Sequence, residues 1–128
     1  MSATRIWTDD QSRDEPEIGP ILDVVETLRW NPNRAIVLEK ADGSLVGFGG
    51  TSEPTKYLLW YQSPEGAVWE AHADVGRTDD RLVSMLAGGQ QGWIEARRLV
   101  DIDTVMDAVR EFHEFGRRPT SCATPAGI

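Results

Sequence analysis

Cysteine and histidine are scarce in this chain, and their scarcity limits the chemistry it can carry. The 128 residues include one cysteine, Cys122, and two histidines, His72 and His113. A single cysteine cannot close an internal disulfide, and so few thiol and imidazole ligands cannot build a structural zinc site. The sequence therefore predicts a protein that holds no metal or cofactor and works in a reducing, cytoplasmic setting.

Long apolar runs are also missing. No stretch approaches the roughly 18 apolar residues that a membrane-spanning helix needs. The N-terminal residues pass quickly into the acidic stretch 9–17, so the apolar centre of a signal peptide is absent. We therefore expect no membrane association and no secretion signal.

Positive charge is in deficit. The chain has 21 carboxylates against 13 lysines and arginines, which gives a formal net charge of −8. Phosphate backbones repel such a surface, so direct binding of nucleic acid is disfavoured. An acidic protein suits a basic partner, although the same charge also serves solubility alone.

Catalytic motifs are absent too. The sequence has no nucleophile elbow, and the glycines at 47, 49 and 50 lack the Gly-Lys-Ser/Thr ending of a phosphate loop. His72 and Asp74 share a face at the end of a predicted strand, but this spacing is common. We predict that the chain is not an enzyme. The alternative is a small ligand-binding or enzymatic domain with a pocket lined by Trp60, Trp69 and His72.

What is present is a globular pattern of one α+β domain. Apolar residues at helical spacing predict a helix from residue 18 to 28, which ends before Pro32, and a second helix from residue 102 to 115. Asp103 or Asp101 can cap the second helix, and Gly116 can end it. Between the helices, strands are predicted at 35–40, 45–49, 56–62, 67–72 and 82–86, with short strands within 93–100 and 120–124.

These elements define the expected architecture. It comprises an N-terminal helix, an antiparallel sheet of five to six strands, and a C-terminal helix packed on the sheet. We expect a flexible acidic segment over residues 1–14, the domain itself over 15–124, and a tail over 125–128.

The second predicted helix carries an acidic ridge. Four carboxylates fall within an arc of about 80°, because successive residues turn by about 100°; they are Asp103, Asp107, Glu111 and Glu114. The ridge is either a solvated outer face or a surface that speeds encounter with a basic partner. Trp93, directly after a Gly-rich segment, is a candidate exposed anchor for such a partner.

The end of this helix resembles a known family. Ala108, Val109 and Phe112, followed by the run from Gly116 to Pro119, are similar to the closing motif of the first-numbered immunity-protein family of bacterial polymorphic toxin systems. In that family a helix with Ala-Val-x-x-Phe runs into Gly-x-Arg-Pro. Members commonly carry a tryptophan a few residues later, whereas this chain reads Thr-Ser-Cys-Ala-Thr.

The resemblance implies a function. A member of this family is a cognate inhibitor that binds a toxin domain, often a nucleic-acid deaminase, in a one-to-one complex. Such a toxin holds DNA or RNA in a basic cleft, which an acidic immunity protein could occlude by charge and bulk.

Overall fold

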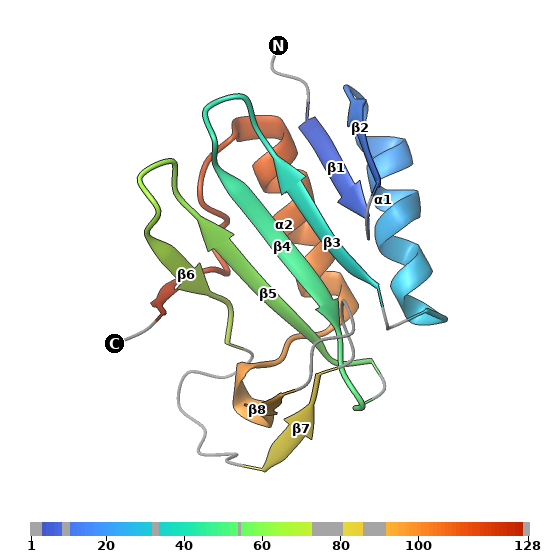
Figure 1. Cartoon of the computed structure of the whole chain (residues 1–128), viewed down its shortest axis with the longest axis vertical. Coiled ribbons are helices and arrows are strands. Elements are labelled where there is room, and N and C mark those ends of the chain that lie inside the picture. Colours follow the sequence, from blue (N-terminus) through green and yellow to red (C-terminus); the bar gives the residue numbers. More distant parts are fainter. Residues whose placement is uncertain are drawn as a thin grey trace.

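The computed structural model describes residues 4–8, 11–31, 34–53, 55–72, 81–85 and 92–126. A seven-stranded antiparallel sheet has the order β2-β1-β3-β4-β5-β6-β9, and a separate two-stranded sheet pairs β7 with β8 (Figure 1). The elements are β1 (Thr4–Thr8), β2 (Gln11–Glu15), α1 (Ile18–Glu26), η1 (Thr27–Arg29), β3 (Ala35–Glu39), β4 (Leu45–Gly50), β5 (Tyr57–Gln62), β6 (Val68–Glu70), β7 (Leu82–Ser84), β8 (Trp93–Glu95), η3 (Ala96–Arg98), α2 (Ile102–Phe115) and β9 (Thr124–Pro125).

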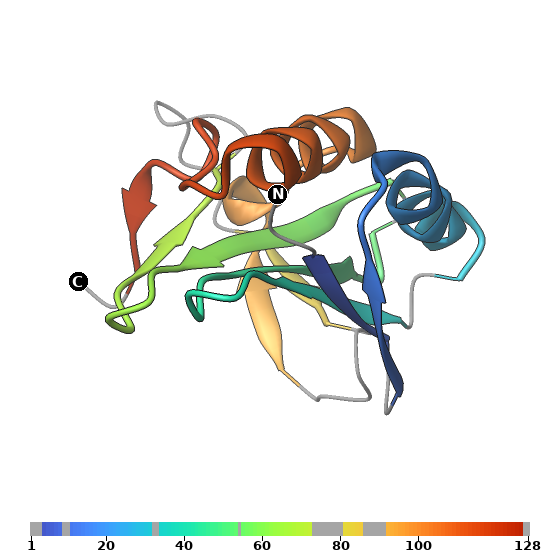
Figure 2. The same ribbon diagram turned by 90° about the horizontal axis from the view of Figure 1, so that it is seen from above.

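The predicted α+β class is confirmed, with more strands than the five to six expected. Both helices lie on one side of the seven-stranded sheet, and β8 lies on the other (Figure 2). The main core forms between the sheet and the helices, where Val105, Val109 and Phe112 of α2 are fully buried. Burying a side chain of this size contributes about 1.5–3 kcal/mol, so the apolar stripe of α2 is a major source of stability.

The hairpin of β3 and β4 follows directly from its sequence. Asp42 accepts hydrogen bonds from the backbone N–H and the hydroxyl of Ser44, and Gly43 takes a φ of 93° in the turn. A positive φ is natural for glycine because it has no Cβ. The next strand, β5, buries Tyr57, Leu59 and Tyr61 on the helix side.

The N-terminal segment differs from the prediction. Instead of a loosely ordered stretch up to residue 14, β1 and β2 form a hairpin, and β1 also pairs with β3. Burial explains the pairing, because Ile6 of β1 joins the main core at 2% exposure. All of β2 except its last residue, Glu15, is exposed, so its sequence shows no apolar alternation that would have indicated a strand.

The fifth strand predicted over 82–86 also needs correction. Leu82–Ser84 is a strand, but it pairs with β8 in the small sheet and not with the main one; residue 86 lies outside the described part of the chain. Val83 and Ile94 point inward and form a second apolar cluster with Leu99, against which Leu58 of β5 packs. Among the described residues, no helix combines the length and apolar character that a bilayer crossing demands.

Candidate functional site

The acidic ridge of α2 is present, but its four members differ in environment. Asp103, Asp107 and Glu114 are exposed on the side of α2 that faces away from the sheet. Asp107 lies 3.2 Å from Arg110, and its side chain is 79% exposed. A pair so exposed contributes little to stability, so Asp107 remains available to a partner.

Glu111, the fourth member, is engaged within the molecule. Its carboxylate accepts hydrogen bonds from the backbone N–H of Thr120 at 2.9 Å and from the Thr120 hydroxyl at 3.0 Å. Arg117 also approaches it at 3.8 Å. These contacts hold the chain reversal after α2, so Glu111 has a structural role that helical spacing could not indicate.

The N-terminus of α2 settles which aspartate caps it. Asp101 accepts hydrogen bonds from the Thr104 backbone N–H at 2.9 Å and from its hydroxyl at 2.8 Å. The hydrogen bond from the Thr104 N–H, reinforced by the one from its hydroxyl, lowers the pKa of Asp101. Asp103 is therefore not the cap and stays exposed in the first turn.

Together the two helices make one side of the molecule strongly acidic. Residues 18–26 and 102–115 contain six carboxylates and one arginine, a net charge of −5; the residues are Asp23, Glu26, Asp103, Asp107, Glu111, Glu114 and Arg110. We call this surface the helical side. Two arginines just outside these helices, Arg29 and Arg117, pair with Glu26 and Glu111 and offset part of this charge. Helix α1 was not part of the predicted acidic ridge.

Trp93 is exposed, at 71%. Leu82 is also exposed, at 58%, and it pairs with Glu95, which shares a strand face with Trp93. Trp93 and Leu82 are therefore diagonal neighbours on the outer face of the small sheet, within reach of each other's side chains. The sequence predicted a strand over 82–86 but did not indicate that Leu82 is exposed beside Trp93.

The structure does not bring Trp93 and the acidic ridge together. The small sheet packs on Leu58 from the side opposite to the helices, and Figure 2 shows α2 and β8 on opposite sides of the main sheet. The five predicted partner-binding residues thus belong to two surfaces, and their roles in binding stay predictions.

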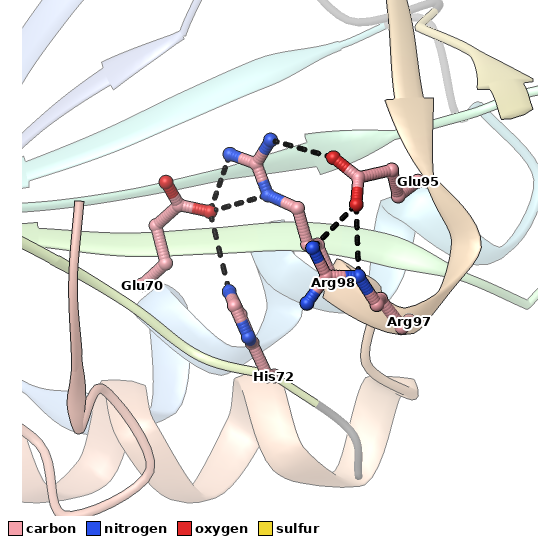
Figure 3. Close-up of polar contacts among 5 residues, drawn as sticks. All are labelled: Glu70, His72, Glu95, Arg97 and Arg98. Atoms are coloured by element: carbon pink, nitrogen blue, oxygen red, sulfur yellow. Dashed lines mark hydrogen bonds and ion pairs between the residues drawn. The ribbon is translucent and has the colours of Figure 1, made fainter. Parts of the chain in front are cut away.

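A network of charged residues holds the small sheet against β6 (Figure 3). Arg98 donates from Nε at 2.8 Å and from Nη2 at 2.5 Å to the same oxygen of Glu70. Glu95 lies 4.0 Å from Arg98 and 2.5 Å from Arg97. His72 Nε2 lies 3.6 Å from the same Glu70 oxygen. The network joins β6, β8 and η3, and each carboxylate in it has an arginine partner.

The pocket expected in the alternative function does not form. Trp60 pairs with Glu70 on the open face of the sheet, whereas Trp69 contacts Tyr61 on the helix face and lies 4.7 Å from the Arg118 guanidinium. Trp60 and Trp69 therefore point to opposite faces and cannot line one pocket with His72. The suggested partner of His72, residue 74, lies outside the described part.

The remaining candidate groups are structural. Burial raises the pKa of Cys122 to about 12, which makes its thiol a poor nucleophile at neutral pH. His113 is half-buried on α2, and its Nδ1 lies 2.9 Å from the Thr4 hydroxyl. Within the described residues, no group of three or more His, Cys, Asp or Glu side chains is arranged to hold a metal ion.

A family model described as "Immunity protein Imm1" matches residues 9–124, which is most of the chain. No curated protein matches the sequence.

Proposed function

The chain belongs to the Imm1 immunity protein family, and from this premise we propose that it binds a cognate toxin domain in a one-to-one complex and occludes a basic substrate cleft. The toxin we propose is a nucleic-acid deaminase of a polymorphic toxin system. The chain itself acts by binding and not by catalysis, in the cytoplasm of the producing cell.

The observation that carries the proposal is the charge of the helical side. A cleft that holds DNA or RNA must present positive charge to phosphates. The exposed carboxylates of Asp103, Asp107 and Glu114 offer that cleft a surface that competes with phosphate. A net charge of −5 on two adjacent helices attracts a basic domain over about one Debye length, roughly 10 Å at 0.1 M salt.

Reversing single charges on the helical side tests this arrangement. Asp103→Lys and Asp107→Lys are compared with Glu65→Lys, which makes the same charge change in the exposed turn between β5 and β6. The partner is the toxin domain from the reading frame beside this chain's gene, inactivated at its catalytic residue. We expect each helical variant to lower the association rate constant by about threefold to tenfold at low salt, because long-range attraction governs encounter.

High salt should shrink the difference, since screening removes the attraction. Thermal unfolding of each variant checks that the fold is intact, and rescue of growth on co-expression with the active toxin checks neutralisation. If all three variants associate at the wild-type rate, the helical side is not the surface that meets the toxin.

A further inference from the structure

In the part of the chain that the structure describes, no strand pairs with the outer edge of β8, and two large apolar side chains are exposed on the outer face of the small sheet. The hydrogen-bond ladder between β7 and β8 continues beyond both ends of the two strands. The Met85 N–H donates to the Gly92 carbonyl at 3.0 Å, and the Ala96 N–H donates to the Arg81 carbonyl at 2.8 Å. Directly opposed residues of an antiparallel pair alternate between bonded and non-bonded positions. Between these bonded pairs, Ser84↔Trp93 and Leu82↔Glu95 must therefore be the non-bonded pairs.

This register fixes where the backbone groups of β8 point. The N–H and C=O groups of Trp93 and Glu95 are directed away from β7, toward the outer edge of β8. The other strand is different, because β7 also takes part in the contact from the Ser52 N–H to the Ser84 carbonyl at 2.9 Å. An edge with outward polar groups next to an exposed tryptophan is a template for pairing with another strand.

We propose that this edge pairs with β8 of a second copy of this chain, so that the free protein forms a two-fold dimer with a four-stranded sheet β7-β8-β8-β7. With the two-fold axis at Ile94, Trp93 lies opposite Glu95 of the second copy. Both residues have outward backbone groups, so each such pair exchanges two hydrogen bonds and the dimer gains four.

Side chains fit the same register. On the outer face, Trp93 of one copy lies beside Glu95 of the other, with the other copy's Leu82 one strand further. On the inner face, Ile94 meets its own counterpart, so the apolar cluster of Val83 and Ile94 becomes continuous across the dimer. Pairing thus places the exposed Trp93 of each copy against a side chain of the other copy.

Charge favours a second copy over the toxin as the occupant of this edge. Among the described residues around the small sheet, three arginines and three glutamates form the pairs Arg81–Glu53, Arg97–Glu95 and Arg98–Glu70, so these six charges cancel. A chain of net charge −8 can approach its own copy through such a region, whereas its helical sides repel each other. A basic toxin gains its attraction at the helical side instead.

The dimer leaves the proposed function intact. Because the helical side lies across the main sheet from β8, each copy in the dimer still presents it, and the ratio of toxin to immunity protein remains one to one. The edge is three residues long, so the dimer should be weak and form only as concentration rises.

Sedimentation equilibrium of the full chain without toxin tests the dimer, across a concentration series. Trp93→Ala removes the side chain, and Trp93→Pro also removes the outward N–H. Trp30→Ala is the matched control, because Trp30 is similarly exposed at 69% but lies at the end of η1. We expect Trp93→Ala to raise the dimer dissociation constant at least about tenfold, Trp93→Pro to raise it further, and Trp30→Ala to leave it unchanged.

Hydrogen exchange gives a readout independent of any variant. The amides of Trp93 and Glu95 in the wild-type chain should exchange more slowly as concentration rises, while those of other exposed segments do not change.

The proposal is overturned if the wild-type chain stays monomeric throughout the concentration series, or if Trp30→Ala disrupts a dimer that both Trp93 variants keep. A monomer whose Trp93→Ala variant releases the toxin faster would make Trp93 a toxin contact, and that result also overturns the dimer. None of these outcomes bears on the charge-reversal test of the helical side.

Discussion

Two aspartates at the start of α2 show how one residue's position decides its role. Asp101 and Asp103 both suit a cap by composition, and the sequence left the choice open. In the structure Asp101 takes an extended backbone conformation and accepts from Thr104, whereas Asp103 lies inside the first turn with its carboxylate exposed. Asp101 therefore stabilises the fold, whereas the carboxylate of Asp103 is exposed and takes no part in the cap.

This assignment predicts unequal costs of removal. Asp101→Ala should lower the free energy of unfolding by about 1 kcal/mol, the usual cost of losing an N-cap, and Asp103→Ala by only a few tenths. Urea unfolding at neutral pH measures both. The folded-state pKa of Asp101 is lowered, so its contribution is complete above the ordinary value of 3.8 and is lost as the pH falls below it. The two variants should thus converge in stability in acid, and equal costs at neutral pH would contradict the assignment.

At the scale of elements, a tryptophan lies across a glycine on the open face of the sheet. Gly47 of β4 pairs directly with Trp60 of β5. A Cβ on Gly47 would lie 2.1 Å from Cζ2 of the Trp60 indole, a distance at which the ring must move. A glycine inside a strand often marks such a close approach, so here the sequence feature and the packing agree.

Gly47→Ala should therefore destabilise the fold by about 1–3 kcal/mol, the range for forcing extra volume into a packed contact. Gly19→Ala is the control, because its Cβ would meet no atom within 4 Å in α1. That change should leave stability unchanged or raise it by up to about 1 kcal/mol. Denaturant unfolding measures both variants. Trp60→Leu combined with Gly47→Ala should recover part of the loss, and full additivity of the two changes would show that the ring is not the obstacle.

Elements with their own periodic signal could be predicted from the sequence, and those that depend on a distant partner could not. The stripe of α2, its end at Gly116 and the hairpin of β3 and β4 follow from local spacing and turn chemistry. β2 has no such signal, since it is an exposed edge strand that exists because β1 pairs with it. Leu82–Ser84 is recognisable as a strand, but nothing local shows that it leaves the main sheet for β8.

In the candidate site, too, features set by local spacing could be predicted and contacts with distant residues could not. Helical spacing predicted that the α2 carboxylates share a face, and the structure confirms the exposure of Asp103, Asp107 and Glu114. The bond from Thr120 to Glu111 could not be predicted, because it depends on how the chain reverses nine residues later. For the same reason the sequence could not show that Trp93 lies across the sheet from α2.

At the scale of the whole molecule, the main sheet separates two surfaces of different chemistry. The two helices of the helical side carry a net charge of −5, whereas the described residues of the opposite side pair Arg97 and Arg98 with glutamates and expose Trp93 and Leu82. The first suits fast encounter with a basic domain, and the second suits contact with a neutral, partly apolar surface. Because these surfaces lie on opposite sides of the main sheet, the proposed toxin contact and the proposed dimer are compatible.

A half-buried histidine, His113, links helix α2 to the main sheet. His113 of α2 lies with its Nδ1 2.9 Å from the hydroxyl of Thr4 in β1. The carbonyl of the same residue accepts from Nζ of Lys40, after β3, at 2.8 Å. Burial, followed by the charge of Lys40, lowers the pKa of His113, although Glu15 and the Pro16 backbone act in the opposite direction. Protonation therefore places a second positive charge beside a buried lysine.

Acidification should accordingly weaken the attachment of the helices to the sheet. The folded-state pKa of His113 lies below the ordinary value of 6.5. At pH values between these two pKa values the unfolded chain binds more protons than the folded chain, so the free energy of unfolding falls as the pH falls through this range. Chemical unfolding at a series of pH values between neutral and mildly acidic measures the slope. His113→Gln should flatten this slope, because glutamine can still bond to Thr4 but does not titrate. If His113→Gln retains the wild-type slope, the loss of stability in acid comes from other groups and this histidine does not link the layers electrostatically.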